Sequence, residues 1–348
     1  MITNLQIRNF RGLRDVTLRD LRRVNLLVGG NDTGKTSVLE ALILLLSDVR
    51  LVQKLPTAFR NNQSGERNNH NHNENDDSEN FWPWLFFDRN YSNTISINAE
   101  VSGQQSVQIK TEQGPAGVYP GQNVLPTPTL SRYENNTRST DLVIYERDRV
   151  NLIGNIPAKN FHVGCLSIRP SDPVQDAEKY NQIALESDGE KQFEQIMREV
   201  EPRLKRLRYA KLPRTSSPLV FVDLGLSRSV PATQMGQAFN RLLHIYAEIL
   251  TSKINVLLID EIENGIFSES LPLIWKGLFA VCQQQNVQIF ATTHSRECVM
   301  AAHQAAEDRG QDELSVQRLQ IVNATIEAVR LGKPHLEMAA EMGLEVRS

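Results

Sequence analysis

The feature that most constrains the fold is the octapeptide Gly-Gly-Asn-Asp-Thr-Gly-Lys-Thr at residues 29–36, which fits the pattern G-x-x-x-x-G-K-[ST]. An apolar run at residues 24–28 precedes it, and a helix-forming run at residues 36–50 follows it. Glycines let backbone N–H groups converge on one anion, and a helix N-terminus adds partial positive charge. A plain Gly-rich turn is the alternative, but the flanking strand and helix favour a phosphate-binding P-loop. We therefore expect a nucleoside triphosphate to bind here.

The side chains of this loop have different expected tasks. Lys35 supplies a point charge for the β- and γ-phosphates, and the Thr36 hydroxyl can ligate Mg²⁺. ATP and Mg²⁺ are the expected cofactors, although the loop does not distinguish ATP from GTP. The residues expected to bind ATP from the loop are Gly30, Asn31, Asp32, Thr33, Gly34, Lys35, Thr36 and Ser37.

A second motif supplies two carboxylates. Residues 256–261 read Val-Leu-Leu-Ile-Asp-Glu, which predicts a buried parallel strand with two acids at its carboxyl end. Ligands bind at that end of a parallel sheet. In this Walker B pattern Asp260 would hold Mg²⁺ through water, and Glu261 would polarise the attacking water. Two solvated acids at a strand end are the alternative, which the P-loop makes the weaker interpretation.

Two further segments are candidates for phosphate contacts. Residues 287–294 predict another strand, and His294 at its end can hydrogen-bond a γ-phosphate, although a lone histidine is more often structural. The segment Met235-Gly236-Gln237 precedes an amphipathic helix and offers the N-terminus of that helix to a ligand. An ABC-type signature loop contacts the γ-phosphate of the other subunit in this way.

Composition limits the alternatives. A formal net charge of −3 over 348 residues gives no global basicity that would indicate nucleic-acid binding. Cys165, Cys282 and Cys298 are scattered without metal-ligand spacing, which is typical of a reducing cytoplasm. No apolar stretch reaches the roughly 18 residues of a membrane span, and the N-terminus lacks a signal-peptide pattern. We therefore expect a cytoplasmic protein with no membrane segment.

The rest of the chain divides by sequence pattern. Residues 61–80 contain almost no apolar side chain, which predicts a flexible loop. His70 and His72 within it fit a solvated loop better than a metal tract. The predicted domains are an ATPase core at residues 1–50 and 232–348, a flexible polar insertion at 51–80, a β-rich lobe at 81–168 with a loop at 113–140, and a helical lobe at 169–231.

Three segments together carry a family resemblance. They are residues 7–12 (Ile-Arg-Asn-Phe-Arg-Gly), residues 258–265 (Leu-Ile-Asp-Glu-Ile-Glu-Asn-Gly) and residues 291–295 (Ala-Thr-Thr-His-Ser). With the P-loop they resemble ABC-type ATPases of the RecF/SMC group, and within it the OLD-family ATPases and their stand-alone relatives in bacterial anti-phage systems. The resemblance implies an α/β P-loop NTPase, namely an ABC-type ATPase head with a β-rich lobe and a helical signature lobe.

The resemblance also implies a homodimer or higher homo-oligomer. Two heads would sandwich two ATP molecules, and each P-loop would face Met235, Gly236 and Gln237 of the other head. Arg11 would lie near the phosphates, and His294 would be the switch histidine. The signature loop departs from transporter ATPases because it lacks their leading Leu-Ser, and Gln63 is a poor candidate for the Q-loop glutamine. We expect no Toprim nuclease domain after His294, and therefore no DNA cleavage by this chain alone.

Three functions fit these observations. The first is an ATPase that dimerises around ATP and controls a separate effector protein, such as a nuclease, in bacterial anti-phage defence. The second is a RecF-like DNA-binding ATPase in DNA repair. The third is a slowly hydrolysing, nucleotide-locked scaffold, which depends on the role of Glu261.

Basic residues in the segment 198–214 bear on the second function. Such a cluster can bind DNA phosphates, although the flanking glutamates make a solvated face the more usual interpretation. The basic residues are Arg198, Arg203, Lys205, Arg206, Arg208, Lys211 and Arg214.

Overall fold

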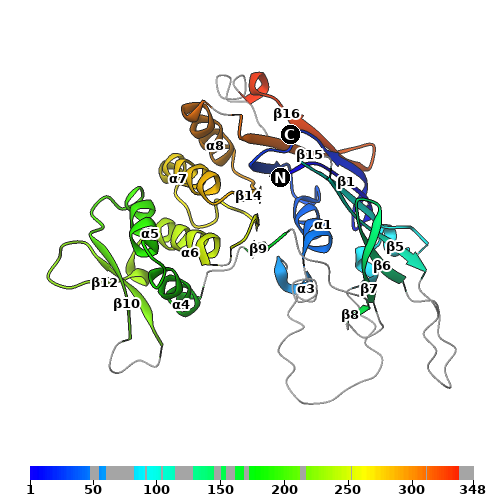
Figure 1. The fold of residues 1–348 in the computed structure, drawn as a ribbon. Helices are drawn as coiled ribbons and strands as arrows, with labels where there is room; N and C mark the ends of the chain where they lie inside the picture. The colour runs from blue at the N-terminus through cyan, green and yellow to red at the C-terminus, as the bar shows by residue number, and fades with distance from the viewer. Residues whose placement is uncertain are drawn as a thin grey trace, which may run out of the picture.

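The computed structural model describes most of the chain. The described residues are 1–47, 55–59, 82–90, 92–102, 105–113, 128–144, 150–153, 161–167, 172–211, 217–251, 253–310 and 312–336. Nearly all of the predicted polar insertion, including Gln63, His70 and His72, lies outside them. Within them the chain forms three β-sheets with helices between and beside them, a mixed α/β fold as predicted (Figure 1).

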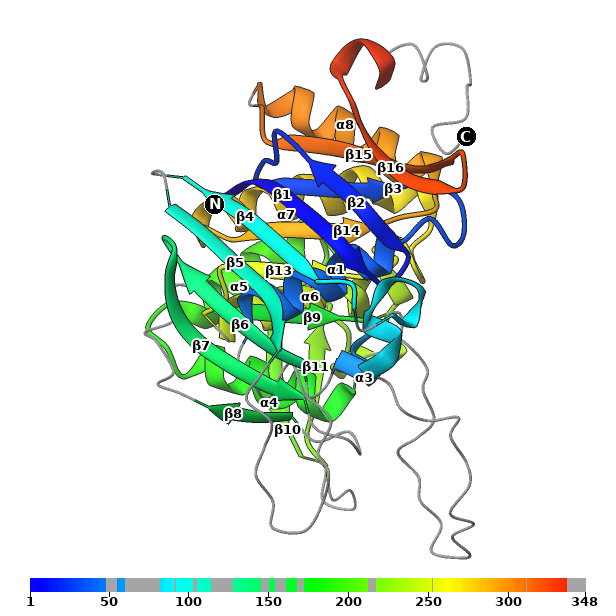
Figure 2. The same ribbon diagram turned by 90° about the vertical axis from the view of Figure 1, so that its right-hand side faces the viewer.

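The largest sheet is antiparallel and has the strand order β2-β1-β4-β5-β6-β7-β8. Figure 2 shows its strands side by side, with β1 between β2 and β4. The strands are β1 (Ile2–Phe10), β2 (Leu13–Leu18), β4 (Ser96–Val101), β5 (Gln105–Gln113), β6 (Pro128–Glu134), β7 (Thr137–Ile144) and β8 (Val150–Ile153).

The predicted loop at 113–140 is wrong for its second half, where β6 and the start of β7 form a hairpin. Asn135 and Asn136 form its turn with φ of 48° and 64°. Asparagine tolerates this left-handed region, and two successive positive φ values match the twist of a hairpin. The strands themselves are rich in Thr, Ser and Arg, so their apolar alternation is weak, and composition alone suggested a loop.

A second sheet positions the motifs. Its order is β16-β15-β3-β14-β13-β9, and all its neighbouring strands are parallel except β16 with β15. The carboxyl ends of β3, β14 and β13 therefore lie side by side at one edge. The strands are β3 (Val24–Val28), β9 (Val163–Leu166), β13 (Val256–Ile259), β14 (Gln288–Thr292), β15 (Leu314–Val322) and β16 (Thr325–Leu331).

Helix α1 (Lys35–Leu46) lies between these two sheets (Figure 1). Eleven of its twelve residues are buried, which explains why it shows no polar face in the sequence. Alternate residues of the parallel strands face opposite ways. Leu27 and Leu258 belong to the apolar cluster around α1, whereas Leu26 and Leu257 belong to the cluster on the other side.

The other side of the parallel sheet is covered by α6 (Gln237–Thr251), α7 (Leu271–Gln284) and α8 (Arg296–Arg309). Beyond α6 lie α4, α5 and the small antiparallel sheet β10-β11-β12 (Figure 1). Their bounds are α4 (Pro173–Ala184), α5 (Gly189–Arg198), β10 (Arg206–Ala210), β11 (Leu219–Asp223) and β12 (Val230–Pro231). The short helices are α3 (Leu55–Ala58), η2 (Trp82–Leu85), η3 (Phe87–Arg89), η4 (Ala232–Gln234) and η5 (Ser268–Ser270).

The predicted division into domains stays a prediction, but sheet membership differs from it at two places. β1 and β2 from the expected core segment 1–50 join the large antiparallel sheet, and β9 from the expected lobe 81–168 joins the parallel sheet. Both differences arise because strands far apart in sequence pair with one another. Among the described helices, none combines the length and apolar character needed to cross a membrane.

Candidate nucleotide-binding site

A cavity of about 650 Å³ opens where the parallel strands β3, β13 and β14 end. It brings together residues from all the predicted nucleotide motifs except the signature loop. Those lining it are Arg11, Asn31, Asp32, Thr33, Gly34, Lys35, Thr36, Ser37, Asp260, Glu261 and His294. Gly30 contributes through its carbonyl oxygen, which accepts a hydrogen bond from Lys35.

Two glycines give the P-loop its shape. A Cβ on Gly29, whose φ is 143°, would lie 2.2 Å from the carbonyl oxygen of Leu319. A Cβ on Gly34, whose φ is 84°, would lie 2.6 Å from Leu13. Gly34 is also the N-cap of α1 and makes no side-chain hydrogen bond to it. The N-terminus of α1 therefore receives no acceptor from its cap residue, which suits an anion-binding position.

The Lys35 ammonium group is held over the loop. Its Nζ donates to the carbonyl oxygens of Gly29 at 3.0 Å and Gly30 at 2.6 Å, and the residue is 5% exposed. Burial lowers the pKa of Lys35, whereas the nearby carboxylates of Asp260 and Glu261 oppose that shift. A phosphate group is a stronger acceptor than a carbonyl for this charged donor.

Thr36 and Asp260 face each other across the cavity floor. Thr36 Oγ1 lies 3.4 Å from Asp260 Oδ1 and 3.5 Å from Oδ2, and Thr292 Oγ1 donates to Asp260 Oδ1 at 2.6 Å. Burial raises the pKa of Asp260, and the hydrogen bonds from Thr292 and Thr36 counteract this.

This pair of oxygen donors fits Mg²⁺. Adjacent ligands of octahedral Mg²⁺ are separated by about 3 Å, so at the observed 3.4 Å from Thr36 the Asp260 carboxylate could reach the ion directly or through the water expected from the sequence. Among the described residues, no three His, Cys, Asp or Glu side chains gather as a metal cluster. Phosphate oxygens and water would therefore complete the shell, as is usual for Mg²⁺ at nucleotide sites.

Glu261 and His294 lie beside this pair. Glu261 Oε1 is 4.0 Å from His294 Nε2, and each side chain is about one third exposed. Glu261 has a φ of 47°, an uncommon conformation for this residue type, and its N–H donates to Thr292 Oγ1 at 2.8 Å. Burial and the neighbouring Asp260 raise the pKa of Glu261, and His294 opposes this.

Glu263, to which the sequence patterns gave no role, connects two loops at this site. Its Oε1 accepts hydrogen bonds from the backbone N–H groups of His294 at 2.7 Å and Ser295 at 3.1 Å. Glu263 therefore ties the segment after β13 to the segment after β14. In the sequence, the position of Glu263 two residues after Glu261, in the loop that follows β13, was the feature that could have indicated this role.

Arg11 lines the cavity and forms an ion pair with a buried glutamate. Its Nε is 2.5 Å and its Nη2 3.0 Å from the two carboxylate oxygens of Glu40 in α1. The Glu40 side chain is fully buried and that of Arg11 is 9% exposed. In the sequence Glu40 only interrupted an apolar run. In the structure it offsets the charge of Arg11 beside the P-loop.

One wall of the cavity was not predicted. It comprises Phe59, Trp84, Phe86, Asp88, Arg89 and Ile326. Phe86 forms an isolated bridge with Phe10, and the Arg11 N–H donates to the Leu85 carbonyl at 2.7 Å. These contacts fasten residues 82–89 beside the turn after β1. The dense aromatic run after the polar tract was the only signal in the sequence.

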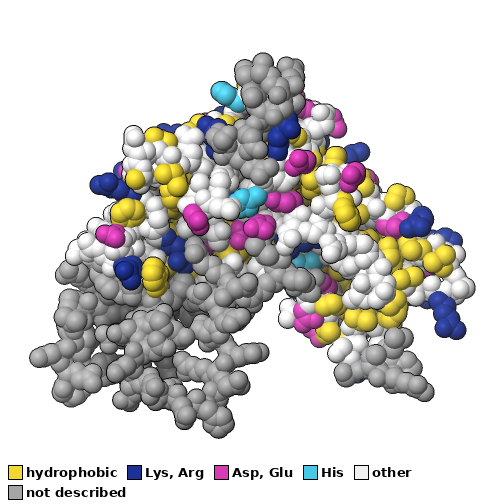
Figure 3. Space-filling model, turned by 180° about the vertical axis from the view of Figure 1, so that it is seen from behind, with side chains coloured by type: hydrophobic (Ala, Val, Ile, Leu, Met, Phe, Trp, Pro, Cys, Tyr) yellow, Lys and Arg dark blue, Asp and Glu magenta, His cyan; other side chains and the backbone are white. Residues whose placement is uncertain are grey.

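The basic segment 198–214 is largely neutralised by acids. Four arginines have carboxylate partners: Arg198 with Glu194, Arg203 with Glu201, Arg206 with Glu190 and Arg208 with Asp223. Arg214 lies outside the described residues. On the face shown in Figure 3, the Lys and Arg side chains of the described residues are scattered, whereas acidic side chains lie near its middle. The geometry therefore favours a solvated face over a DNA-binding surface.

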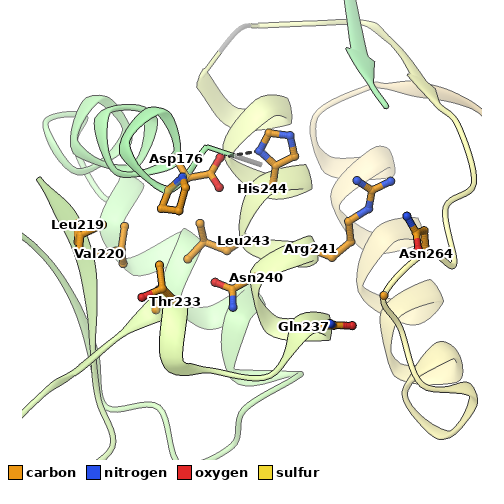
Figure 4. A pocket seen from close by; sticks show the side chains of 13 residues that line it. Asp176, Leu219, Val220, Thr233, Gln237, Asn240, Arg241, Leu243, His244 and Asn264 are labelled. Carbon is orange, nitrogen blue, oxygen red and sulfur yellow. Dashed lines mark hydrogen bonds and ion pairs between the residues drawn. The ribbon is translucent and has the colours of Figure 1, made fainter. Parts of the chain in front are cut away.

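The signature-loop residues Met235, Gly236 and Gln237 do not line the nucleotide cavity of their own chain. They stand at the start of α6, beside a second cavity of about 410 Å³ that Gln237 helps to line (Figure 4). A Cβ on Gly236 would meet no atom within 4 Å, so Gly236 faces open space, whereas Met235 packs against the apolar core on the α6 side of the sheet. Their role toward a second nucleotide stays a prediction.

The second cavity has its own charged side chains (Figure 4). His244 Nδ1 lies 2.5 Å from Asp176 Oδ1, which joins α6 to α4. Arg241 donates through Nη1 to the Ser167 carbonyl at 3.1 Å and lies 3.5 Å through Nη2 from the Asp260 carbonyl. Arg241 therefore links the signature helix to the backbone of the Walker B segment.

Comparisons with known proteins identify the chain as an AAA ATPase domain. A family model described as an AAA ATPase domain matches residues 1–205, and a second AAA domain model matches residues 131–299. An "ATP/GTP phosphatase" of Helicobacter pylori is 20% identical over 335 residues, which is 89% of each chain. The DNA replication and repair protein RecF of Nitrosococcus oceani is 54% identical over 44 residues, 13% of this chain and 12% of that protein.

Solved structures of SMC heads share the fold. An SmcHead bound to the C-winged helix domain of ScpA gives a TM-score of 0.55 at 10% identity and covers 99% of both chains. A Pyrococcus furiosus Smc head with an extended coiled coil, bound to the C-terminal domain of ScpA, gives 0.50 at 10% identity over 99% of this chain and 100% of that one. At this identity the likeness concerns the fold alone, and it confirms the predicted fold class.

Proposed function

Since this chain belongs to the AAA ATPase domain family, we propose that it binds ATP with Mg²⁺ and hydrolyses it to ADP and phosphate. One observation carries the proposal. Thr36 of the P-loop lies 3.4 Å from Asp260, a residue more than 200 positions later that follows β13, which is separated from the P-loop strand β3 by β14. Both motifs were predicted separately, and their meeting in one cavity supports a common ligand.

The binding residues act at different atoms of the triphosphate. Lys35 would exchange its two carbonyl acceptors for oxygens of the β- and γ-phosphates, while the N-terminus of α1 faces the same anion. Thr36 and Asp260 would hold Mg²⁺, which when bound neutralises charge on the transferred phosphoryl group.

Glu261 is the proposed general base. A water oxygen attacks the γ-phosphorus, Glu261 accepts the water proton, and the bond from the γ-phosphorus to the bridging oxygen breaks so that ADP leaves. The hydrogen bond from the Glu261 N–H to Thr292 holds the carboxylate over the cavity. His294 lies 4.0 Å from Glu261 and would hydrogen-bond the γ-phosphate.

The finer proposal is that two chains close around ATP. The signature residues lie outside the nucleotide cavity of their own chain and Gly236 faces open space, so a second chain would be needed to bring ATP to them. We also propose that the closed dimer controls a separate effector, such as a nuclease, in anti-phage defence. That step rests only on the resemblance of the motifs to OLD-family ATPases. DNA binding has weaker support, because four arginines of the basic segment are paired with acids.

The test is the Glu261→Gln variant, with phosphate release and molecular mass measured with and without Mg-ATP. Loss of a general base lowers a rate about 10²- to 10⁴-fold while leaving binding intact. We therefore expect almost no phosphate release, retained ATP binding and a dimer that persists with ATP. The matched control is Glu269→Gln, an exposed acid that does not line the cavity. A Glu261→Gln protein that hydrolyses ATP at the wild-type rate would remove Glu261 from the mechanism. A Glu261→Gln protein that binds ATP but stays monomeric would contradict the proposed ATP-bound dimer.

A further inference from the structure

We propose that Trp84 and Arg89 form the surface on which the nucleotide base stacks. This inference rests on the proposed function, because it assumes that a nucleoside triphosphate occupies the cavity. It adds the element that recognises the base, which the phosphate motifs leave undefined.

The parallel sheet gives the nucleotide a direction. In the order β16-β15-β3-β14-β13, the P-loop follows the middle strand β3. Asp260 and Glu261 follow β13 on one side, and they define the γ-phosphate end of the cavity. Ile326 lies in β16 on the other side. The nucleoside end of the cavity is therefore the end toward β16.

The segment 82–89 is attached to that same end. The Arg11 N–H donates to the Leu85 carbonyl, and Phe86 forms a β-bridge with Phe10. This segment therefore packs against the turn that joins β1 to β2. Gly12 in the turn lies next to Ile326, since a Cβ there would be 3.6 Å from the Ile326 side chain. Trp84 and Arg89 line the cavity from this side.

Trp84 is suited to stacking. The Arg89 guanidinium carbon lies 4.7 Å from the centroid of the Trp84 ring, a cation–π contact that steadies the indole. Trp84 is nevertheless 54% exposed, although tryptophan is highly buried on average. The ring therefore keeps a large open surface within a nucleotide-sized cavity. Every base has a π-face, and stacking on an aromatic side chain is a common mode of binding it.

The backbone around Arg89 is strained in a way that supports this role. Asp88 and Arg89 have successive φ values of 54° and 51°, a left-handed conformation that non-glycine residues seldom adopt. The Arg89 N–H bonds to the Phe86 carbonyl at 3.0 Å, and the Asn93 side chain bonds to the Phe87 carbonyl at 3.0 Å. These bonds hold the segment in the conformation in which Arg89 covers Trp84. Such strain is found preferentially at ligand sites.

The test compares two ligands that differ in the nucleoside. Dissociation constants of Mg-ATP and of Mg-tripolyphosphate are measured by calorimetry for the full chain and for its Trp84→Ala and Trp84→Phe variants. Loss of one stacking contact weakens binding by about tenfold or more. We expect Trp84→Ala to raise the ATP constant by that factor and to leave the tripolyphosphate constant unchanged. Trp84→Phe keeps an aromatic face, so we expect it to restore most of the affinity.

Fluorescence gives a second readout. ATP should quench the tryptophan emission of the wild-type protein, tripolyphosphate should not, and Trp84→Phe should lose the quenching while it retains ATP affinity. Tyr209→Ala removes an exposed aromatic side chain outside the cavity and serves as the matched control. Because Trp84 is exposed, we expect the midpoint of thermal unfolding to be the same in its variants.

The outcomes separate this inference from the proposed function. If the dissociation constant of Mg-ATP is unchanged in Trp84→Ala, Trp84 does not bind the base. The proposal also fails if Trp84→Ala changes only the molecular mass, from dimer to monomer, because Trp84 would then contact a second chain. Equal wild-type affinity for ATP and tripolyphosphate also overturns it. If the wild-type protein binds neither ligand, the proposed function itself fails, and this inference fails with it.

Discussion

The two cavities differ in how their charged groups are satisfied. In the nucleotide cavity Lys35 rests on carbonyl oxygens of its own loop, and Thr36 and Asp260 are 3.4 Å apart. In the cavity beside α6, Asp176 and His244 are 2.5 Å apart and Arg241 binds the Ser167 carbonyl. The first set of groups gains stronger partners when an anion and a cation arrive. In the second set Asp176 and His244 already have each other as partners within the protein.

This difference indicates which of the two cavities needs a ligand. Burying a charge without a partner is costly, so a cluster of buried charged groups indicates either an internal network or an external ligand. Around α6 the network is internal and spans α4, α6 and the end of β9. We therefore assign chemistry to the nucleotide cavity and a positioning role to the cavity beside α6.

Lys35→Ala should have the largest effect on the affinity for Mg-ATP. It removes a charged donor from the phosphate site, and two charge-assisted hydrogen bonds correspond to a change of about a hundredfold in affinity. We expect the dissociation constant of Mg-ATP to rise by about that factor in calorimetric titration. Lys276→Ala, an exposed lysine on α7, should bind ATP as the wild-type protein does. An unchanged constant in Lys35→Ala would contradict the P-loop assignment.

The polar half of this site could be predicted because its determinants are local. The P-loop, Asp260, Glu261 and His294 each follow a short apolar strand, and parallel strands place their carboxyl ends together. Two short patterns and one topological rule therefore place these side chains without any knowledge of the rest of the chain. The strands β3, β13 and β14 were likewise predicted from their apolar runs.

The other half depends on contacts between distant segments. Arg11 pairs with Glu40 only because the turn after β1 packs on α1, and Trp84 reaches the cavity only because Phe86 bridges to Phe10. Neither contact leaves a periodic pattern in the sequence. The error at β6 and β7 has a related cause, since a polar strand in a sheet with an exposed face resembles a loop in composition.

Arg241→Met should have an intermediate effect and would test whether the two cavities are linked. Methionine keeps much of the length of the side chain but loses the hydrogen bonds to the Ser167 and Asp260 carbonyls. The Walker B segment would then be held less firmly, so we expect kcat for ATP hydrolysis to fall about tenfold, with less change in KM. Arg241→Lys keeps one donor group and should restore part of the rate. A wild-type rate in Arg241→Met would show that the link has no catalytic role.

His244→Phe should have the smallest effect on ATP binding and hydrolysis, and the clearest effect on the free energy of unfolding. It leaves the Asp176 carboxyl group buried without its imidazole partner, and a buried polar group that loses its hydrogen-bond partner costs about 3 kcal/mol. We expect the free energy of unfolding in urea to fall by about that amount, while the dissociation constant of Mg-ATP stays the same. Adding Asp176→Leu to this variant removes the unpaired charge and should recover part of the loss. If His244→Phe instead weakens ATP binding without loss of stability, the cavity beside α6 is coupled to the nucleotide, and the contrast between the two cavities fails.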